Sequence, residues 1–391
     1  MKKNIAVIFG GQSVEHDVSI ITAHIPIIQS LLASGQFNVQ PIYISKDGSW
    51  YSDQAMNNLN FFKQTNFIGA NGICPKQKKI QILFDQGLKL VWPGFRPKVV
   101  KIDVVFPAMH GTFGEDGSLM GLLRMANVPF IGCDLFASTI AMDKVLTKQI
   151  LSKENIPVVP YIWFTKFDWE TNKNTLKEKA LKLKWPVFIK PVHLGSSIAI
   201  TKVKQQSDLE NMIEVALHYD DKILIEESIE NLIEVTLPII GNDILQTGEI
   251  ERPLNKTEFF NFNDKYLSGG KKYGGMKNRY SEIPANIKNE LAEQVKSLGL
   301  KSYRVLGCSG ISRVDFLINN DSQNVFVNEI NTLPGSLYCH NWRKAGISNV
   351  ELVVKLVALA EERFKARQKI TYIFDSDVLN FTTIQVHEHN A

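Results

Sequence analysis

The first thirty residues restrict the possible fold more than any other part of the sequence. Residues 5–9 form a short apolar run, Gly10 and Gly11 follow, and residues 18–32 carry apolar side chains at helical spacing. A strand, a glycine turn and a helix in this order are typical of a parallel sheet covered by helices. The apolar run 104–106, the glycine-rich loop after it and the helical segment 119–125 repeat the order. The sequence therefore predicts an α/β fold with a Rossmann-like, mostly parallel N-terminal sheet, whose binding edge lies at the strand C-termini.

Composition excludes several classes of protein. The 391 residues are 44% hydrophobic and 21% charged, which is ordinary for globular proteins and excludes collagen-like and disordered chains. With 44 basic and 40 acidic residues, the net charge of +4 argues against a nucleic-acid partner. Four widely spaced cysteines indicate neither a disulfide framework nor a zinc site, and no apolar run is long enough for a membrane helix. We therefore expect a cytoplasmic protein of two or three domains, with no membrane or nucleic-acid partner.

The rest of the chain predicts further strands and helices. Strands are expected at residues 39–44, 158–164, 186–191, 198–203, 223–227, 234–240, 312–318 and 325–329. Helices are expected at residues 139–152, 176–183, 287–298 and 350–369. The segments 186–191 and 198–203 flank a Gly/Ser loop and predict a hairpin-like pair. The residues after 370 are expected to form an added strand or a tail.

Two neighbouring strands carry a set of polar residues that could bind a metal. Arg313 and Asp315 are two residues apart, as are Glu329 and Asn331, so each pair shares one face of its strand. Carboxylate and amide oxygens suit magnesium bound together with substrate phosphates. A solvated strand face with an Arg–Asp ion pair is the alternative. Gly335 follows in a Leu-Pro-Gly turn, whose backbone N–H groups could stabilise an oxyanion.

A second group of residues could bind phosphate. Lys190 precedes the loop Gly195-Ser196-Ser197, and Lys144 could reach the same phosphates. The loop lacks the Walker pattern, because no Gly-Lys-Ser/Thr sequence opens a helix. The alternatives are a tight hairpin turn for the loop and a solvated helix charge for Lys144.

The glycine loops of the N-terminal part supply a third group. The turn at Gly10 lacks dinucleotide-binding spacing, whereas Glu15 on the binding edge would suit an ammonium group. His110 lies on an equivalent edge, beside closely spaced glycines. A histidine that is simply hydrogen-bonded in the core is the alternative there.

Taken together, these motifs resemble those of D-alanine–D-alanine ligases, a family of the ATP-grasp superfamily. The similar stretches occur in family order from residue 4 to about 335: residues 10–16, 110–117, 141–144, 188–191 with 195–197, 264–266, 283–285, 312–316 and 329–335. The resemblance implies a three-domain ATP-grasp architecture with domains at 1–132, 133–227 and 228–391. It also implies ligation of two D-alanines at the expense of ATP, for peptidoglycan precursors, and a homodimer in the cytoplasm.

The resemblance assigns roles residue by residue. The ATP-binding residues would be Lys144, Lys190, Ser196, Ser197, Glu226 or Glu227, Glu234 and Lys265. Two Mg²⁺ or Mn²⁺ ions would be held by Asp315, Glu329 and Asn331. Arg313 and the Gly335 backbone would stabilise the tetrahedral intermediate. The first D-alanine would be oriented by Glu15, Ser196 and Tyr266, with His110 near its carboxylate. Its carboxylate would attack the γ-phosphate, and the amine of the second substrate would attack the acyl phosphate.

Two segments depart from the family pattern. A Thr-containing stretch and a Ser-Leu pair usually follow Gly335, but residues 336–343 here read Ser-Leu-Tyr-Cys-His-Asn-Trp-Arg. Ser336, His340 or Arg343 could replace the missing contacts to the second substrate. The alternatives are therefore a ligase for another second substrate and, more remotely, a non-catalytic nucleotide-binding homologue. The segment 267–281 is longer and more basic than a typical closing loop, either as a tolerated insertion or as a different lid.

Overall fold

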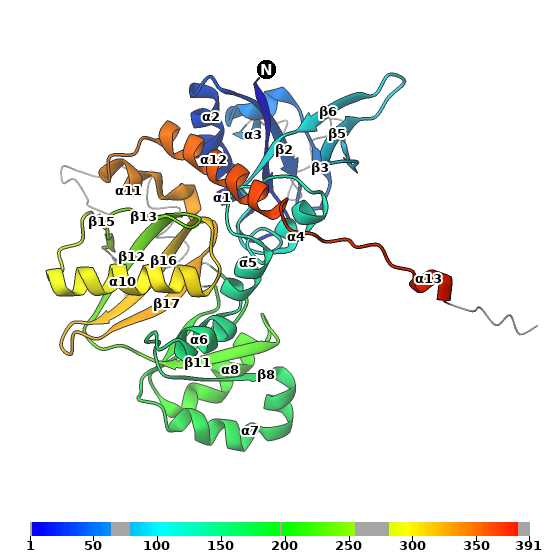
Figure 1. The fold of residues 1–391 in the computed structure, drawn as a ribbon. Coiled ribbons are helices and arrows are strands. Elements are labelled where there is room, and N and C mark those ends of the chain that lie inside the picture. Colours follow the sequence, from blue (N-terminus) through cyan, green and yellow to red (C-terminus); the bar gives the residue numbers. More distant parts are fainter. Residues whose placement is uncertain (1, 64–78, 196–197, 255–280, 382–391) are drawn as a thin grey trace, which may run out of the picture.

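The computed structural model describes residues 2–63, 79–195, 198–254 and 281–381. Within these ranges the chain forms three four-stranded sheets, which we call the N-terminal, central and C-terminal sheets. Figure 1 shows the N-terminal sheet at one end of the molecule and the central sheet at the other, with the C-terminal sheet between them. The mixed α/β fold predicted from the sequence is thereby confirmed.

The N-terminal sheet has the predicted parallel core. Its strand order is β3 (Trp50–Tyr51), β2 (Phe37–Ile44), β1 (Lys3–Gly10) and β7 (Val104–Pro107). Strand β1 pairs in parallel with β2 and β7, and only β3 is antiparallel. The helical run after β1 consists of α1 (His16–Thr22), the π-helical η1 (Ala23–Ile28) and α2 (Gln29–Ala33). Pro26 lies inside the π-helical stretch, where its missing N–H group interrupts regular α-helical hydrogen bonding.

Smaller elements complete the N-terminal part. They are η2 (Gln54–Asn57), α3 (Asn60–Lys63), an antiparallel sheet of β4 (Gln81–Phe84), β5 (Leu88–Trp92) and β6 (Lys98–Ile102), and α4 (Ser118–Met125). The predicted helix at residues 119–125 corresponds to α4. Gly117, at the helix N-cap, has a φ of 92°, a backbone conformation that favours glycine.

The prediction of a single helix at residues 139–152 is wrong. The structure has two helices, α5 (Leu135–Met142) and α6 (Lys144–Lys153), which are separated by Asp143. Asp143 has extended backbone angles, and its carboxylate accepts hydrogen bonds from the N–H groups of Val145 and Leu146. Aspartate is a preferred N-cap residue because it satisfies these otherwise unpaired donors. The chain therefore turns at Asp143 and starts a new helix there.

The central sheet is antiparallel and carries its helices on one side. The elements are β8 (Tyr161–Thr165), α7 (Lys166–Leu181), β9 (Val187–Pro191), β10 (Thr201–Val203), η3 (Gln206–Asp208), α8 (Leu209–Leu217) and β11 (Lys222–Glu227), with strand order β10-β9-β11-β8. The expected pair around the Gly/Ser loop is present as β9 and β10. Helix α7 begins before the predicted residue 176, because Thr165 and Asp168 form a capping box. Ile189 and Ile225 pack with α7 and α8 in one core cluster.

The C-terminal sheet is also antiparallel. The elements are β12 (Leu232–Gly241), β13 (Leu245–Thr247), β16 (Gly310–Asn319) and β17 (Val325–Asn331) in the order β13-β12-β16-β17, with β14 (Arg252–Pro253) paired to β15 (Ser281–Glu282). Helix α10 (Asn289–Val305) covers one face, where Leu237, Val314 and Phe316 are buried. Because side chains alternate along a strand, Thr236, Arg313 and Asp315 lie on the other face.

The end of the chain returns to its beginning. The elements are η5 (Gly335–Tyr338), α11 (Cys339–Lys344), α12 (Asn349–Arg367) and α13 (Val378–Phe381). Leu352 and Leu356 of α12 belong to the same core cluster as Ile5 and Phe9 of β1, and α12 lies beside α2 in Figure 1. Arg363 donates hydrogen bonds to the carbonyl oxygens of residues 130 and 132. Helix α12 is thus part of the N-terminal core.

Residues 371–377 form neither helix nor strand, so the tail alternative is the one observed in this stretch. Figure 1 shows the chain leaving the body there toward α13. None of the helices in the described ranges has the length and apolar character of a membrane span. The domain boundaries near residues 132 and 227 stay predictions.

Candidate active site

The polar face of the C-terminal sheet brings the predicted metal-binding residues together. Arg313 donates two hydrogen bonds to Asp315, from Nε at 2.6 Å and from Nη2 at 2.5 Å. Asn331 donates from Nδ2 to Oδ2 of Asp315 at 3.2 Å. Asp315 lies directly opposite Glu329 in the strand register, and an irregularity follows at Phe316. Two carboxylates and an amide on adjoining strands are a donor set that fits a divalent cation. The Arg313–Asp315 ion pair of the alternative interpretation is present at the same place.

The polar face of the central sheet carries a buried cluster of acidic and basic side chains. Glu226, on β11, forms ion pairs with Lys190 of β9 and with Lys148 of α6; the Lys148 Nζ lies 2.9 Å from Glu226 Oε2. Lys148 and Glu226 are each only 1% exposed. Burial raises the pKa of Glu226, but Lys148 and Lys190 outweigh it and lower the pKa to about 2. Burial also lowers the pKa of Lys148, against the opposing effect of Glu226.

Lys144 points toward the segment that precedes the Gly/Ser loop rather than into solvent. Its ammonium group donates to the carbonyl oxygens of Leu194, at 2.6 Å, and Val192, at 3.3 Å. Burial lowers the pKa of Lys144, and Glu329 acts in the opposite direction. Lys190 of the central sheet and Glu329 of the C-terminal sheet both act electrostatically on Lys144 of α6, so these three groups face one common site. Ser196, Ser197, Lys265 and Tyr266 lie outside the described residues.

The two adjacent glutamates of β11 point in different directions. Glu226 faces the lysines, whereas Glu227 accepts a hydrogen bond from the backbone N–H of Lys184 at 2.9 Å. Glu234 lies on the same face of β12 as Thr236, and its side chain is half-buried. The lysine-bearing face thus includes Glu226 and excludes Glu227.

Glu15 and His110, the third predicted group of site residues, lie at the edge of the N-terminal sheet. Glu15 is 5% exposed, and a Cβ built on Gly111 or Gly195 would lie 2.9 Å or 3.6 Å from its Oε2. Its carboxylate therefore lies against both the loop after β7 and Gly195. His110 is buried, with Nε2 3.0 Å from Thr22 Oγ1 and Nδ1 3.3 Å from Glu115 Oε1. Burial lowers the pKa of His110, but Glu115 and Glu15 outweigh it and raise the pKa.

The segment that departs from the family pattern begins beside these residues. The backbone N–H of Ser336 donates to Thr22 Oγ1 at 3.3 Å, so Thr22 contacts both Ser336 and His110. His340 Nε2 lies 2.8 Å from Glu251 Oε2. Arg343 instead donates to Asn349 at the start of α12. The structure thus brings Ser336 to the site residues of the N-terminal sheet, whereas it ties Arg343 to α12.

Comparison with known proteins extends over nearly the whole chain. Protein-family models described as D-ala D-ala ligase N-terminus and C-terminus match residues 4–133 and 150–358. The D-alanine--D-alanine ligase of Thermosipho africanus is 35% identical over 378 residues, which cover 96% of this chain and 98% of the relative. That of Natranaerobius thermophilus is 36% identical, with 94% and 98% covered. The chain belongs to the D-alanine–D-alanine ligase family.

Solved structures agree with this family. A D-alanine-D-alanine ligase from Coxiella burnetii has a TM-score of 0.77 at 27% identity, covering 94% of this chain and 96% of that one. The VanG D-Ala:D-Ser ligase from Enterococcus faecalis has a TM-score of 0.74 at 30% identity, covering 92% and 100%. The fold is therefore the ATP-grasp fold of the D-alanine–D-alanine ligases, as the motifs predicted.

Sequence reasoning missed four residues that contact the candidate site residues: Lys148, Thr236, Glu251 and Tyr338. Lys148 lies four residues after Lys144 on α6, so one helical turn places both lysines on the same face. That spacing was the available signal. Thr236 shares a strand face with Glu234, which strand periodicity could have shown. Nothing in the sequence indicates that Glu251 and Tyr338 approach Thr236.

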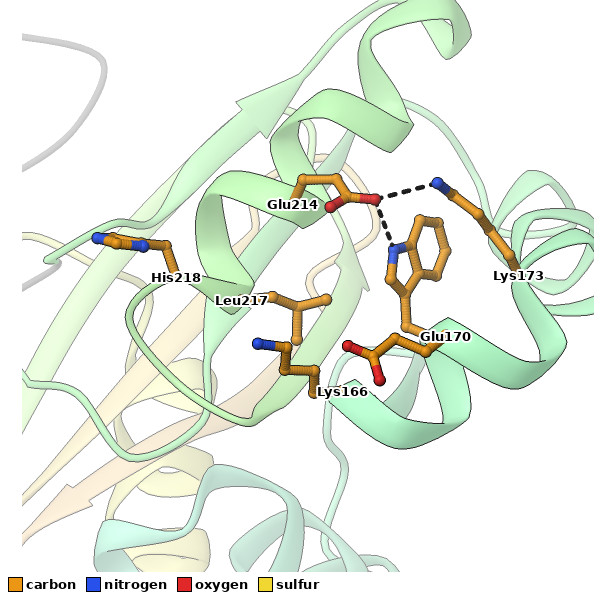
Figure 2. A pocket seen from close by; sticks show the side chains of 7 residues that line it. Lys166, Glu170, Lys173, Glu214, Leu217 and His218 are labelled. Carbon is orange, nitrogen blue, oxygen red and sulfur yellow. Dashed lines mark hydrogen bonds and ion pairs between the residues drawn. The ribbon is translucent and has the colours of Figure 1, made fainter.

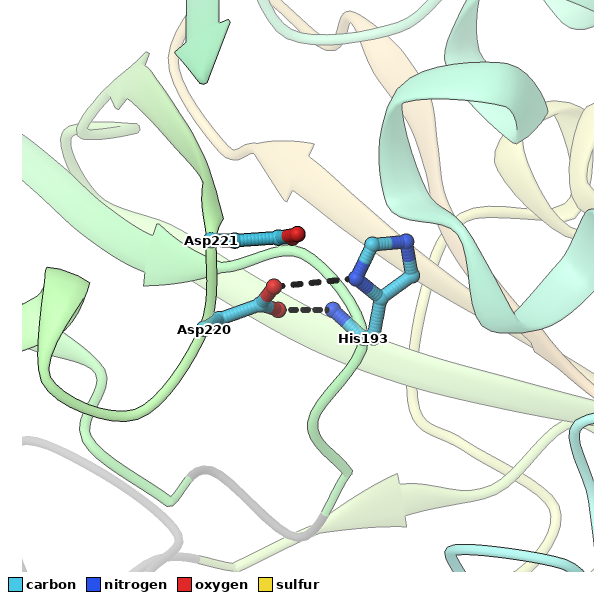
Figure 3. Close-up of side chains that lie close together, drawn as sticks. All are labelled: His193, Asp220 and Asp221. Carbon is cyan, nitrogen blue, oxygen red and sulfur yellow. Dashed lines mark hydrogen bonds and ion pairs between the residues drawn. The ribbon is translucent and has the colours of Figure 1, made fainter. Parts of the chain in front are cut away.

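His193, just before the Gly/Ser loop, is held by carboxylates (Figure 3). Its backbone N–H and ring Nδ1 both contact Asp220, at 2.6 Å and 3.0 Å, and Nε2 lies 3.4 Å from Asp143. These carboxylates, Asp143 first, raise the pKa of His193 to about 9. Asp221 is close enough for a three-residue metal site, but both ring nitrogens already face carboxylates. The cluster is therefore an ion-pair network, and it lines a hollow of about 370 Å³.

A second hollow, of about 340 Å³, lies between α7 and α8 (Figure 2). Glu214 accepts a hydrogen bond from the Trp169 indole and forms an ion pair with Lys173 there. These groups lie on the helix-covered side of the central sheet, opposite Lys190. The hollow is therefore not part of the candidate active site.

Proposed function

We propose that this protein is an ATP-dependent D-alanine–D-alanine ligase, which forms the dipeptide for peptidoglycan precursors and releases ADP and phosphate. The observation that carries the proposal is the family match over nearly the full chain, at 35% identity to a relative of which 98% is covered. The arrangement of charges supports it, because lysines and carboxylates from two sheets meet at one site.

The ATP phosphates bind between Lys144 and Lys190, with Ser196, Ser197 and Lys265 as further contacts. Support comes from Lys144, whose ammonium group already lies at the loop carbonyls. Glu226 contacts the nucleotide on the lysine-bearing face of β11, and Glu234 contacts it from β12. Two Mg²⁺ or Mn²⁺ ions are held by Asp315, Glu329 and Asn331, where they neutralise charge on the transferring phosphoryl group.

The first D-alanine is oriented by Glu15, Ser196 and Tyr266, and its carboxylate lies near His110. That carboxylate displaces ADP from the γ-phosphate, which gives an acyl phosphate. The neutral amine of the second D-alanine then attacks the acyl carbon, and phosphate leaves. Arg313 and the Gly335 N–H donate hydrogen bonds to the oxyanion of the tetrahedral intermediate. Ser336 contacts the second substrate, whereas His340 is held by Glu251.

The test is ADP release with purified protein, ATP, Mg²⁺ and D-alanine alone, together with chromatographic detection of the dipeptide. Turnover on D-alanine alone is the expected result. Turnover only when D-serine, D-lactate or another partner is added would show that the second substrate is not D-alanine. ATP binding without any ADP release would indicate a non-catalytic homologue. We also propose a homodimer in the cytoplasm, which light scattering and cell fractionation test.

A further inference from the structure

The turn after β17 has an unusual backbone. Ser336, Leu337 and Tyr338 are consecutive non-glycine residues with φ values of 51°, 52° and 54°. Left-handed backbone is unfavourable for residues with side chains and persists only where the surroundings enforce it. Leu337 is fully buried in the N-terminal core, and the Ser336 N–H is bound to Thr22. The backbone is thereby held in a form that presents the Tyr338 side chain to the C-terminal sheet.

Tyr338 contacts the polar face of that sheet at two points. Its ring centroid lies 5.0 Å from the guanidinium carbon of Arg313, and its hydroxyl lies 3.1 Å from Thr236 Oγ1. Thr236 is the residue directly opposite Asp315 in the register of β12 and β16. Asp315 in turn accepts two hydrogen bonds from Arg313. A chain of contacts therefore runs from Asp315 through Arg313 and Tyr338 to Thr236, and its two ends lie opposite each other in the sheet.

A second pair supports the ring from another side. The His340 ring centroid lies 4.8 Å from that of Tyr338, and His340 Nε2 is bound to Glu251. Glu251 is only 5% exposed, and its backbone exchanges two hydrogen bonds with Thr236. The ring of Tyr338 thus lies in contact with Arg313 and with His340, and its hydroxyl is fixed to Thr236.

The donors of Arg313 show what this arrangement achieves. Asp315 occupies Nε and Nη2, and no residue in the described part of the chain accepts a hydrogen bond from Nη1. A cation stacked on an aromatic ring is held electrostatically at a fixed distance from the ring face. We propose, on the basis of the proposed function, that Tyr338 is a positioning residue that holds the Arg313 guanidinium so that Nη1 can donate to the oxyanion of the tetrahedral intermediate. The His340–Glu251 pair sets the orientation of the ring.

The experiment compares Tyr338→Ala, which removes the ring, with Tyr338→Phe, which removes only the hydroxyl. Tyr338→Ala should lower kcat about tenfold with the KM for ATP and D-alanine changed less than about twofold, as expected for an interaction made in the transition state. Tyr338→Phe should retain most of kcat. Tyr372→Ala is the matched control, because Tyr372 lies in the exposed tail.

A binding measurement gives a second readout. A tetrahedral phosphinate analogue of the dipeptide, titrated calorimetrically with ADP and Mg²⁺, should bind about tenfold more weakly to Tyr338→Ala and almost normally to Tyr338→Phe. His340→Ala should lower kcat less than Tyr338→Ala does, without raising the KM for the second D-alanine.

Unchanged kcat and analogue affinity in Tyr338→Ala would overturn the proposal. Equal losses of kcat in the Ala and Phe variants, in proportion to their loss of thermal stability, would also overturn it. So would a failure of the unmodified protein to bind the analogue. A raised KM in His340→Ala would instead place His340 in direct contact with the substrate and overturn its role behind the ring. Failure of the unmodified protein to turn over D-alanine, with analogue binding retained and sensitive to Tyr338, would overturn only the proposed function.

Discussion

The central and C-terminal sheets are built alike and charged oppositely. Each is a four-stranded antiparallel sheet with one apolar face covered by helices and one polar face turned toward the common site. On the central sheet, Lys190 and the neighbouring Lys148 surround a single carboxylate, Glu226. On the C-terminal sheet, Asp315 and Glu329 accompany a single guanidinium, that of Arg313. A polyphosphate with bound divalent cations needs basic side chains for its phosphates and acidic side chains for its cations. The two sheets together therefore indicate this kind of ligand better than either sheet alone.

The largest expected effect removes charge from the acidic sheet. Glu329→Gln should lower turnover at least about a thousandfold while the protein stays folded, because the proposed metal site loses a charged ligand worth several kcal/mol at a half-buried position. ADP release measures turnover, and circular dichroism measures folding. Glu293→Gln on the exposed side of α10 is the control. Full activity in Glu329→Gln would mean that the acidic surplus binds no metal.

A second test removes a basic side chain that lies beside the central sheet. Lys148→Met should lower the free energy of unfolding by about 3 kcal/mol, because one partner of a buried ion pair is lost. It should also raise the KM for ATP, since Glu226 and Lys190 lose their support. Urea denaturation measures the first effect and steady-state kinetics the second. Lys153→Met on the exposed side of α6 should change neither.

The double variant Lys148→Met/Glu226→Gln sharpens this result. Its loss of stability should be smaller than the sum of the two single losses, because the two side chains act on each other. Additive losses would show that Lys148 is held by packing alone.

The smallest expected effect concerns His193, which lies just before the Gly/Ser loop and forms ion pairs with Asp143 and Asp220. Its pKa is raised to about 9, so its ion pairs stabilise the fold fully below pH 6.5 and stop doing so as the pH rises through 9. The contribution should be about 1 kcal/mol, because the imidazole is 42% exposed and its ion pairs are screened. His193→Asn should abolish the fall in stability between pH 6.5 and 9 that urea denaturation detects. An unchanged pH profile would contradict this role.

The parts of the site that local rules determine could be predicted. The pairing of Arg313 with Asp315, and their approach to Glu329, follows from alternation along two strands joined by a short turn. The buried position of Lys148 could not be predicted, because a lysine on a helix is normally solvated and its partner Glu226 is distant in sequence. The break at Asp143 had a local signal, an aspartate before helix-forming residues, which the apolar spacing on both sides concealed.

The fold shows the same division. Strand β1 and its helix were recognisable from a run of thirty residues. Helix α12 was recognisable as a helix, but its apolar residues do not indicate which surface they cover. Its packing against β1 is a long-range contact that the structure alone reveals.

The position of α12 has a consequence for biosynthesis. A ribosome releases the chain from its N-terminus, so β1 and its helices emerge long before Asn349. Their hydrophobic core remains incomplete until α12 has also emerged, because Leu352 and Leu356 supply part of it. The part of the protein that is made first is therefore among the last to reach its native state. A nascent chain arrested before residue 349 would expose this surface to chaperones and to aggregation.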